Sequence, residues 1–460
     1  MTDLLSAPEA AEPLRGLLSG RLFFPGDEGY DEARSPWNLA AVLEPAAVAV
    51  PETVAEVQQV VRAAAAAGLR VAPISTGHAA VPLSAFDLSR TVIIRMSSLT
   101  GVTVDPMLRT ARVVGGTVWK DVIAAAAQHG LTGLHGSAGD VAVAGFALNG
   151  GISFYGRRHG ITANAVRAIE LVTADGELHR VDSDHDADLF WALRGGGGNF
   201  GVVTAIELDL LPYADLVAGM MLWDRSRAAE VLPAWRDLTE DAPESVTMSF
   251  RVMTFPPLPD MPPFLSGRDV VVIDGAILES DERASELLAP LRALGPEVDT
   301  FSRIPASGLP LMHMDPPQPT PAVSDSCVLG NLTDGAIDAF LGYLGDGTRS
   351  GLMFGELRQL GGAFARHPDD GGAVSGVDGA YALYALAIAP TPDAASRGLA
   401  ASAALIEVMR PWEQPNSCLL TFAEGTTHGE DAYGTACARL LSIADRVDPE
   451  GMFVAGHSIR

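Results

Sequence analysis

The chain has 460 residues, 48% of them hydrophobic, and this length predicts two or three domains rather than one core. Its formal net charge is −26 and Lys120 is the only lysine, so nucleic acid and anionic membranes are not expected as partners. No run of about 18 apolar residues predicts a membrane helix, and the N-terminus lacks a secretory signal pattern. Cys327, Cys418 and Cys437 are too dispersed for a zinc site, so we expect no metal and a reducing cytoplasmic location.

A β-α-β unit is predicted between residues 46 and 75. AVAVPE reads as a strand, and Thr53 with Glu56 has the spacing of a capping box at a helix start. Valines then recur at helical spacing until Gly68, which ends the helix. LRVAPI is the second strand, and it leads directly into the loop 75–79.

The next segments alternate between strands and short helices. TVIIRM and TARVVGG are strand-like, residues 121–128 are helical, and residues 136–160 form a glycine-rich loop. AIELVTADGELHRV reads as a hairpin with Asp175-Gly176 as its turn. ADLFWALR predicts a short helix, and FGVVTAIELDLLP predicts the strand that closes this part of the chain.

Beyond about residue 212 the pattern indicates an α+β domain. ESVTMSFRVMTF, DVVVIDGAIL, GLMFGELRQLGGAF and ALYALAIAP are strand-like, while SELLAPLRAL and AIDAFLGYL are helical. The last segment predicts a strand over residues 418–422 and one helix over residues 431–447.

The string Gly196-Gly197-Gly198-Asn199-Phe200-Gly201 fits the dinucleotide motif G-x-G-x-x-G. In a dinucleotide-binding fold this loop follows a strand and precedes a helix. Here the order is helix, loop, strand, so the Rossmann interpretation fails on context. We expect these glycines to form a tight turn against something flat or anionic.

Six strings occur in a fixed order along the chain. They are VPETVAEVQQVVRAAAAAGLRVAPISTGHA, GVTVDPMLRTARVVGGTVWKDV, GSAGDVAVAGFALNGGISFYGRRHG, LVTADGELHRV, DADLFWALRGGGGNFGVVTAIELDL and DPEGMFVAGHSI. Each is weak alone, but together they resemble the vanillyl-alcohol-oxidase/PCMH superfamily of FAD enzymes, in its bacterial berberine-bridge-enzyme-like branch. The middle of the chain matches this family only loosely.

The resemblance implies an α+β fold in which a two-subdomain, PCMH-type FAD-binding domain is interrupted by a substrate domain with an antiparallel sheet. The FAD domain would comprise residues 1–213 and 414–460, and the substrate domain residues 214–413. It also implies the residues that bind the cofactor: Ser75, Thr76, Gly77, His78, Ala79, Gly136, Ser137, Ala138, Val143, Gly145, Asn149, Gly150, Gly151, Gly201, Val202, Val203, Phe453 and His457.

In this family the histidine of the first loop bonds the flavin 8α carbon, which implies covalent attachment through His78; the alternative is a histidine that only caps a loop. Small neighbours let main-chain N–H groups approach phosphate closely. Some relatives attach the flavin a second time through a cysteine, but Ala138 stands at that place. We therefore expect monocovalent, 8α-histidyl FAD.

Two further positions carry open alternatives. Asn149 stands where glycine is usual, and its amide is expected either to reach the cofactor or to serve a surface turn. His457 is expected either to hydrogen-bond the flavin pyrimidine carbonyls or to be structural.

The catalytic base differs from the family pattern. Many relatives have a Tyr-x-Asn motif near the C-terminus, but here leucine and Thr421 take those places. Glu356 and Arg358 lie two apart on a predicted strand and so share one face, where a carboxylate in a dry pocket has a raised pKa and an arginine opposes that rise. An outer, solvated Glu/Arg pair is an equal alternative. Tyr381 and Tyr384 are weaker candidates, and only one of Phe250 and Arg251 can face inward.

The implied function is an FAD-dependent oxidase. It would transfer a hydride from a small organic substrate, typical of secondary metabolism, to the flavin, and dioxygen would reoxidise the flavin to give hydrogen peroxide. A flavoprotein cyclase of the same fold, oxidative or non-redox, is the alternative, because the family tyrosine is missing. The residues leave the substrate and the oligomeric state open.

Overall fold

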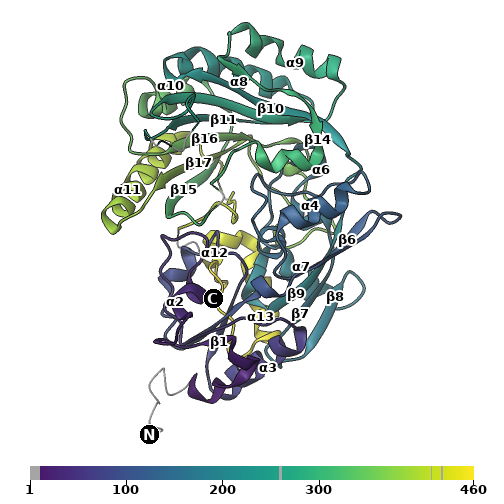
Figure 1. Ribbon diagram of the computed structural model, residues 1–460. Coiled ribbons are helices and arrows are strands. Elements are labelled where there is room, and N and C mark those ends of the chain that lie inside the picture. The colour runs from purple at the N-terminus through teal and green to yellow at the C-terminus, as the bar shows by residue number, and fades with distance from the viewer. Residues whose placement is uncertain (1–10, 258, 260–261, 317, 416, 426–427) are drawn as a thin grey trace.

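The computed structural model describes residues 11–257, 259, 262–316, 318–415, 417–425 and 428–460. Figure 1 shows two halves, with one large sheet and its helices above and two smaller sheets below. The C-terminal segment lies in the lower half, although it follows the large sheet in the sequence (Figure 1). The predicted α+β fold with an antiparallel sheet is confirmed.

A four-stranded sheet contains the predicted β-α-β unit. Its order is β1 (Leu22–Phe23), β2 (Ala47–Ala49), β4 (Thr91–Arg95) and β3 (Arg70–Ile74), and β2, β4 and β3 are parallel. Helix α3 (Val54–Ala66) crosses between β2 and β3. Its predicted capping box between Thr53 and Glu56 is confirmed, and Gly68 follows its end at φ +62°. Helix α2 (Tyr30–Arg34) precedes β2.

A five-stranded antiparallel sheet follows. Its order is β5 (Val102–Asp105), β6 (Thr110–Val114), β9 (Val202–Asp209), β7 (Val166–Val172) and β8 (Leu178–Asp182). The predicted turn between β7 and β8 is confirmed, with Gly176 at φ +76°. Helices α4 (Trp119–Ala127) and α7 (Ala187–Gly196) match two predicted helices in place.

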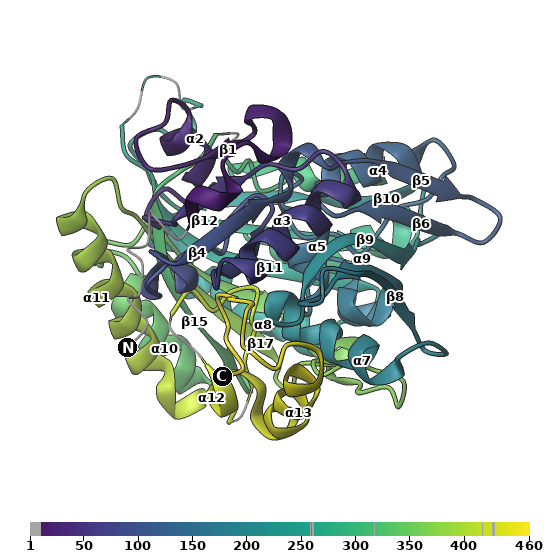
Figure 2. The same cartoon turned by 90° about the horizontal axis from the view of Figure 1, so that it is seen from below.

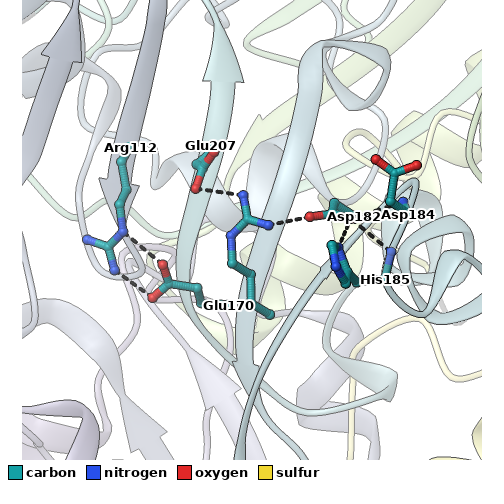
Figure 3. A network of polar contacts seen from close by, with 7 residues as sticks. Arg112, Glu170, Asp182, Asp184, His185 and Glu207 are labelled. Atoms are coloured by element: carbon teal, nitrogen blue, oxygen red, sulfur yellow. Dashed lines mark hydrogen bonds and ion pairs between the residues drawn. The ribbon is translucent and has the colours of Figure 1, made fainter.

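Charged side chains cross the strands on one face of this sheet. Arg112 forms two hydrogen bonds with Glu170, at 2.9 and 2.6 Å, and Arg180 contacts both Glu207 and Asp182 (Figure 3). Such solvated pairs contribute little individually. The network therefore identifies this face as the one turned to solvent.

The large sheet is antiparallel throughout its main path. Its order is β13, β10, β12, β11, β16, β17, β15, and β14 also pairs with β10. The bounds are β10 Asp215–Asp224, β11 Val246–Thr254, β12 Asp269–Ile277, β13 Val298–Asp299, β14 Ser302–Pro305, β15 Ala322–Leu329, β16 Phe354–Gln359 and β17 Tyr381–Ile388.

Helices cover only one face of the large sheet. They are α8 (Ala228–Asp241), α9 (Asp281–Ala293), α10 (Asp334–Leu344) and α11 (Pro392–Met409), and they lie on the side away from the lower half (Figure 1). Phe250 packs in the core under these helices. Arg251, the next residue, points to the opposite face, which answers the question that the sequence left open.

The C-terminal segment returns to the smaller sheets. It contains α12 (Gly429–Tyr433) and α13 (Cys437–Val447), and α13 packs against α7 (Figure 2). A main-chain bridge pairs Val71 with Phe453. No helix in the described ranges is long and apolar enough to cross a membrane.

Three expected elements differ in detail. Residues 418–422 form loop and turn rather than the predicted strand, because they have no ladder partner; Ser326 Oγ donates to the main-chain oxygen of Phe422 instead. The predicted helix 431–447 is broken at Gly434, which has φ +51°. The predicted loop 136–160 contains two short helices, α5 (Val143–Ala147) and α6 (Gly156–His159).

Candidate active site

A large cavity lies where the two smaller sheets, the uncovered face of the large sheet and the C-terminal segment meet. Its empty volume is about 1870 Å³, including the open mouth. Fifteen predicted site residues line it: Ser75, Thr76, Gly77, His78, Ala79, Gly136, Ser137, Ala138, Gly145, Asn149, Gly201, Val203, Arg358, Thr421 and His457. These residues come from distant parts of the chain, so the tertiary fold brings them together.

Six predicted site residues lie away from the cavity lining: Glu356, Val143, Gly150, Gly151, Val202 and Phe453. Val202 and Phe453 pack in the core of the first sheet. Val202 faces that core because its side chain points to the opposite side of β9 from that of Val203. Val143 is in the core of the five-stranded sheet. The carbonyls of Gly150 and Gly151 accept hydrogen bonds from the main-chain N–H groups of Ala163 and Thr162, so these glycines are held against the segment that follows α6.

The loop after β3 has an unusual pattern of main-chain hydrogen bonds. The carbonyl oxygens of Thr76 and Gly77 accept from the main-chain N–H groups of Trp37 and Asn38, at 2.9 and 3.3 Å. Within the described residues, the N–H groups of Gly77, His78 and Ala79 donate no main-chain hydrogen bond. Gly77 has φ +80°, and a Cβ there would lie 2.6 Å from Pro36. The loop therefore presents donors to the cavity and requires glycine at this position.

The His78 ring is held from three directions. It stacks on Trp37 with ring centroids 4.2 Å apart and planes at 15°. Its Nδ1 lies 2.9 Å from Thr76 Oγ1, and its Nε2 lies 3.4 Å from Asp140 Oδ1. The ring lines the cavity, whereas Asp140 lies behind it.

The second glycine loop and the C-terminal segment form a joined wall. Gly196, Gly197 and Gly198 line the cavity, and Asn199 Nδ2 donates to the His457 carbonyl at 2.8 Å. His457 Nε2 donates to the main-chain oxygen of Leu420 at 3.0 Å. Its ring therefore has a structural hydrogen bond as well as a place in the lining.

Asn149 also has an internal partner. Its Nδ2 donates to the Gly145 carbonyl at 2.7 Å, four residues earlier. A Cβ at Gly145 would meet no atom within 4 Å and would project into open space. Gly145 thus leaves the space beside its own main chain open, while Asn149 also lines the cavity.

Glu356 and Arg358 do share one face, and that face is the inner one. They form a buried ion pair, with Arg358 Nη2 2.9 Å from Glu356 Oε1. Burial acts to raise the pKa of Glu356, but Arg358, His313 and Arg251 outweigh it and the pKa is lowered. The expectation of a raised pKa at Glu356 is therefore wrong, because the surrounding cations stabilise its ionised form.

A different carboxylate has the expected property. Glu424 lines the cavity, and its Oε2 is buried with no hydrogen-bond partner among the described residues. Burial raises the pKa of Glu424 to about 7, although polar interactions with Ser324 and Tyr384 act to lower it. Glu424 therefore changes charge near neutral pH.

Aromatic and polar groups surround Glu424. Tyr384 stacks on Phe422 with centroids 4.8 Å apart, and burial and the Glu424 charge hold the Tyr384 pKa well above its usual value. The Arg358 guanidinium lies 5.2 Å from the centre of the Phe422 ring. Thr421 Oγ1 is buried without a hydrogen-bond partner in the described chain. This wall of the cavity thus combines an acid, a cation and flat apolar rings.

A second buried carboxylate, Asp274, lies deeper on the same sheet face. It is fully buried, accepts from Ser249 Oγ at 2.5 Å, pairs with Arg251, and lies 3.2 Å from His313 Nε2. Burial acts to raise the Asp274 pKa, but Arg251 and His313 hold it far below its usual value. Asp274 is therefore a buried, ionised carboxylate that holds Arg251 and His313 in place on this face of the sheet.

Replacing Asp274 by asparagine is expected to cost about 3–5 kcal/mol of unfolding free energy, because Arg251 would stay buried without its counter-charge. Asp209→Asn, which breaks an exposed pair with Arg167, is the control and should cost less than about 1 kcal/mol. Denaturant unfolding measures both. Equal losses of unfolding free energy in the two variants would contradict the argument that burial makes the Asp274–Arg251 pair the more important one.

The sequence reasoning missed several residues of the site. Glu424 was not predicted, because it follows a segment, residues 418–422, whose pattern predicted an ordinary strand. The sequence also does not show that the Glu424 carboxylate is desolvated. Asp140 did leave a signal, because it is the one charged residue in the stretch GSAGDVAVAG. Trp37 also belongs to the site, because it stacks on His78 in the lining.

Comparison with known proteins agrees with this geometry. Residues 45–182 match a family model described as an FAD binding domain. The chain is 31% identical over 208 residues to (R)-6-hydroxynicotine oxidase of Paenarthrobacter nicotinovorans, which covers 45% of each chain. It is 26% identical over 277 residues to chitooligosaccharide oxidase of Gibberella zeae, covering 58% of this chain and 52% of that protein. The matches thus span about half the length of these curated relatives.

The fold extends over the whole chain. The solved structure of the BBE-like 1 protein of Physcomitrella patens has a TM-score of 0.81 at 20% identity and covers 99% of both chains. Residues 45–182 therefore match an FAD binding domain, and the chain as a whole has the fold of this BBE-like structure.

Proposed function

We propose that this protein is an FAD-dependent oxidase that carries its flavin on a single covalent bond to His78 and oxidises a small organic substrate. The observation that carries this proposal is that one cavity is lined both by the main-chain N–H groups of residues 77–79 and by the desolvated carboxylate of Glu424. When bound, FAD would accept a hydride at N5 and pass the electrons to dioxygen, giving hydrogen peroxide.

The residues of the cavity fit FAD. The N–H groups of Gly77, His78 and Ala79, which donate no main-chain hydrogen bond within the described residues, suit a diphosphate. Because the chain has only one lysine, it would hold a diphosphate largely through such main-chain donors. Gly145 leaves room for a flat group to approach the main chain closely, and Gly196, Gly197 and Gly198 line the same cavity. His78 supplies the imidazole for the 8α bond, and Ala138 in the lining has no sulfur for a second one.

Glu424 is the group best suited to accept a substrate proton. A base works best when its pKa lies close to the operating pH, and the Glu424 pKa of about 7 meets that condition. Arg358 would attract electron-rich or anionic parts of the substrate, while Glu356 keeps Arg358 in place. Thr421 would contribute a hydroxyl to substrate or cofactor.

The relatives suggest classes of substrate to test. Those named above are oxidases of 6-hydroxynicotine and of chito-oligosaccharides. Tyr384 and Phe422 form a flat, stacked surface suited to an aromatic or sugar ring. We therefore expect a ring-containing substrate with an ionisable OH or NH group within reach of Glu424.

A non-redox cyclase is the second candidate, because Glu424 could move a proton without any hydride transfer. The test is anaerobic mixing of the purified yellow protein with ring-containing amines and oligosaccharides. An oxidase substrate bleaches the flavin, and air then restores the colour with release of hydrogen peroxide. Product formed without bleaching supports the cyclase. No bleaching and no product from any ring-containing donor would count against both.

A further inference from the structure

Asp140 joins the two rings that meet at the edge of the cavity. One carboxylate oxygen, Oδ2, accepts from Trp37 Nε1 at 2.9 Å, and the other, Oδ1, faces His78 Nε2 at 3.4 Å. Trp37, His78 and Asp140 lie far apart in the sequence and belong to three different loops. The contact is thus made by the tertiary fold and not by local geometry.

The contact assigns different roles to the two nitrogens of His78. A carboxylate only accepts, so the nitrogen that faces Asp140, Nε2, carries the proton. The other nitrogen, Nδ1, then has a free lone pair, toward which the Thr76 hydroxyl donates at 2.9 Å. Burial acts to raise the Asp140 pKa, but His78 and Trp37 outweigh it and the pKa is lowered. Asp140 therefore stays ionised beside the ring.

We propose that Asp140 is the positioning residue that prepares His78 for covalent attachment to the flavin, an inference that rests on the proposed function. It holds the reactive tautomer, stabilises the positive charge that develops on the imidazole, and takes the Nε2 proton. A carboxylate orients a histidine in the same way in hydrolytic triads, but there it does not take the proton, so the proton transfer to Asp140 is a further role.

The attachment step balances as follows. A bond forms between His78 Nδ1 and the flavin 8α carbon, while one C–H bond of that methyl group and the imidazole N–H bond break. Two protons are released, one of them through Asp140, and the electron pair passes into the flavin ring. Dioxygen then takes the electron pair and two protons, giving hydrogen peroxide.

Trp37 holds both partners of this arrangement. Its ring stacks on His78 at 4.2 Å and fixes the plane of the imidazole, while its indole N–H fixes the carboxylate. The Trp37 main chain is itself anchored, since its N–H donates to Thr76 and its carbonyl accepts from Thr320. Trp37 therefore contacts both Asp140 and His78 and fixes their relative positions.

The test compares Asp140→Asn with wild type as purified flavoproteins. Total flavin is read from the visible spectrum, and covalent flavin from fluorescence of the denatured protein after acid precipitation. Asparagine keeps the shape but not the charge, so we expect yellow protein whose covalent fraction forms at least about tenfold more slowly. Asp121→Asn, an exposed aspartate on α4, is the matched control and should behave as wild type.

Two further variants keep the proposal testable if Asp140→Asn folds poorly. Asp140→Glu retains the carboxylate and should recover much of the attachment rate, which a purely structural role would not predict. Trp37→Phe keeps a stacking ring but removes the N–H, and should slow attachment less than Asp140→Asn. Wild-type attachment kinetics in Asp140→Asn would overturn the role of Asp140 alone. Wild-type protein without acid-stable flavin would overturn the covalent attachment on which it rests.

Discussion

The His78→Ala variant is expected to bind flavin in solution and to release all of it on acid precipitation, whereas the wild-type pellet stays yellow. The loss is complete because alanine has no nucleophile, while the N–H groups of the loop and the glycine walls remain to hold FAD non-covalently. The measurement is flavin fluorescence of the denatured protein band. His129→Ala, at an exposed histidine after α4, is the control and should keep its covalent flavin.

Each other outcome has a definite meaning. A yellow pellet from His78→Ala would mean that another side chain holds the flavin. A colourless wild-type pellet from yellow protein would remove the covalent bond from the proposal but leave the fold and the cofactor intact.

The Glu424→Gln variant is expected to lose about 10²–10⁴-fold in kcat/KM, the usual contribution of a general base. The sign of the pH dependence follows from the raised pKa. Because a base acts in its ionised form, wild-type kcat/KM should rise with pH through about 7, where Glu424 loses its proton. This limb of the pH profile should vanish in the variant.

The matched control is Glu430→Gln, which changes an exposed glutamate at the start of α12, a few residues along the same segment. It should leave both kcat/KM and the pH limb unchanged. A limb near pH 7 that persists in Glu424→Gln would assign the proton transfer to another group and would falsify the role of Glu424.

Much of the local architecture could be predicted because it depends on short-range patterns. The capping box at Thr53, the stop at Gly68 and the turn at Asp175-Gly176 each follow from the chemistry of a few neighbouring residues. The failure of the Rossmann interpretation at Gly196–Gly201 also followed from local order alone. The same glycines line the cavity, and the expectation that they lie against a flat or anionic group stays a prediction.

The strand predicted over residues 418–422 shows where local patterns stop being sufficient. A strand needs a partner to satisfy its main-chain groups, and the sequence does not show whether a partner is in place. Here the segment forms a loop instead, and that loop carries Thr421 and Phe422 into the cavity and leads to Glu424.

The sequence by itself determined the class of the fold, the small residues of the cavity-lining loop around His78 and the absence of a cysteine at Ala138, because these depend on residue type and order. Only the tertiary structure decided which of two carboxylates has a raised pKa. Glu356 and Glu424 are the same residue type, but Glu356 lies among buried cations that lower its pKa, whereas Glu424 is desolvated without a compensating charge. That difference arises from groups brought together from distant parts of the chain, and no local pattern records it.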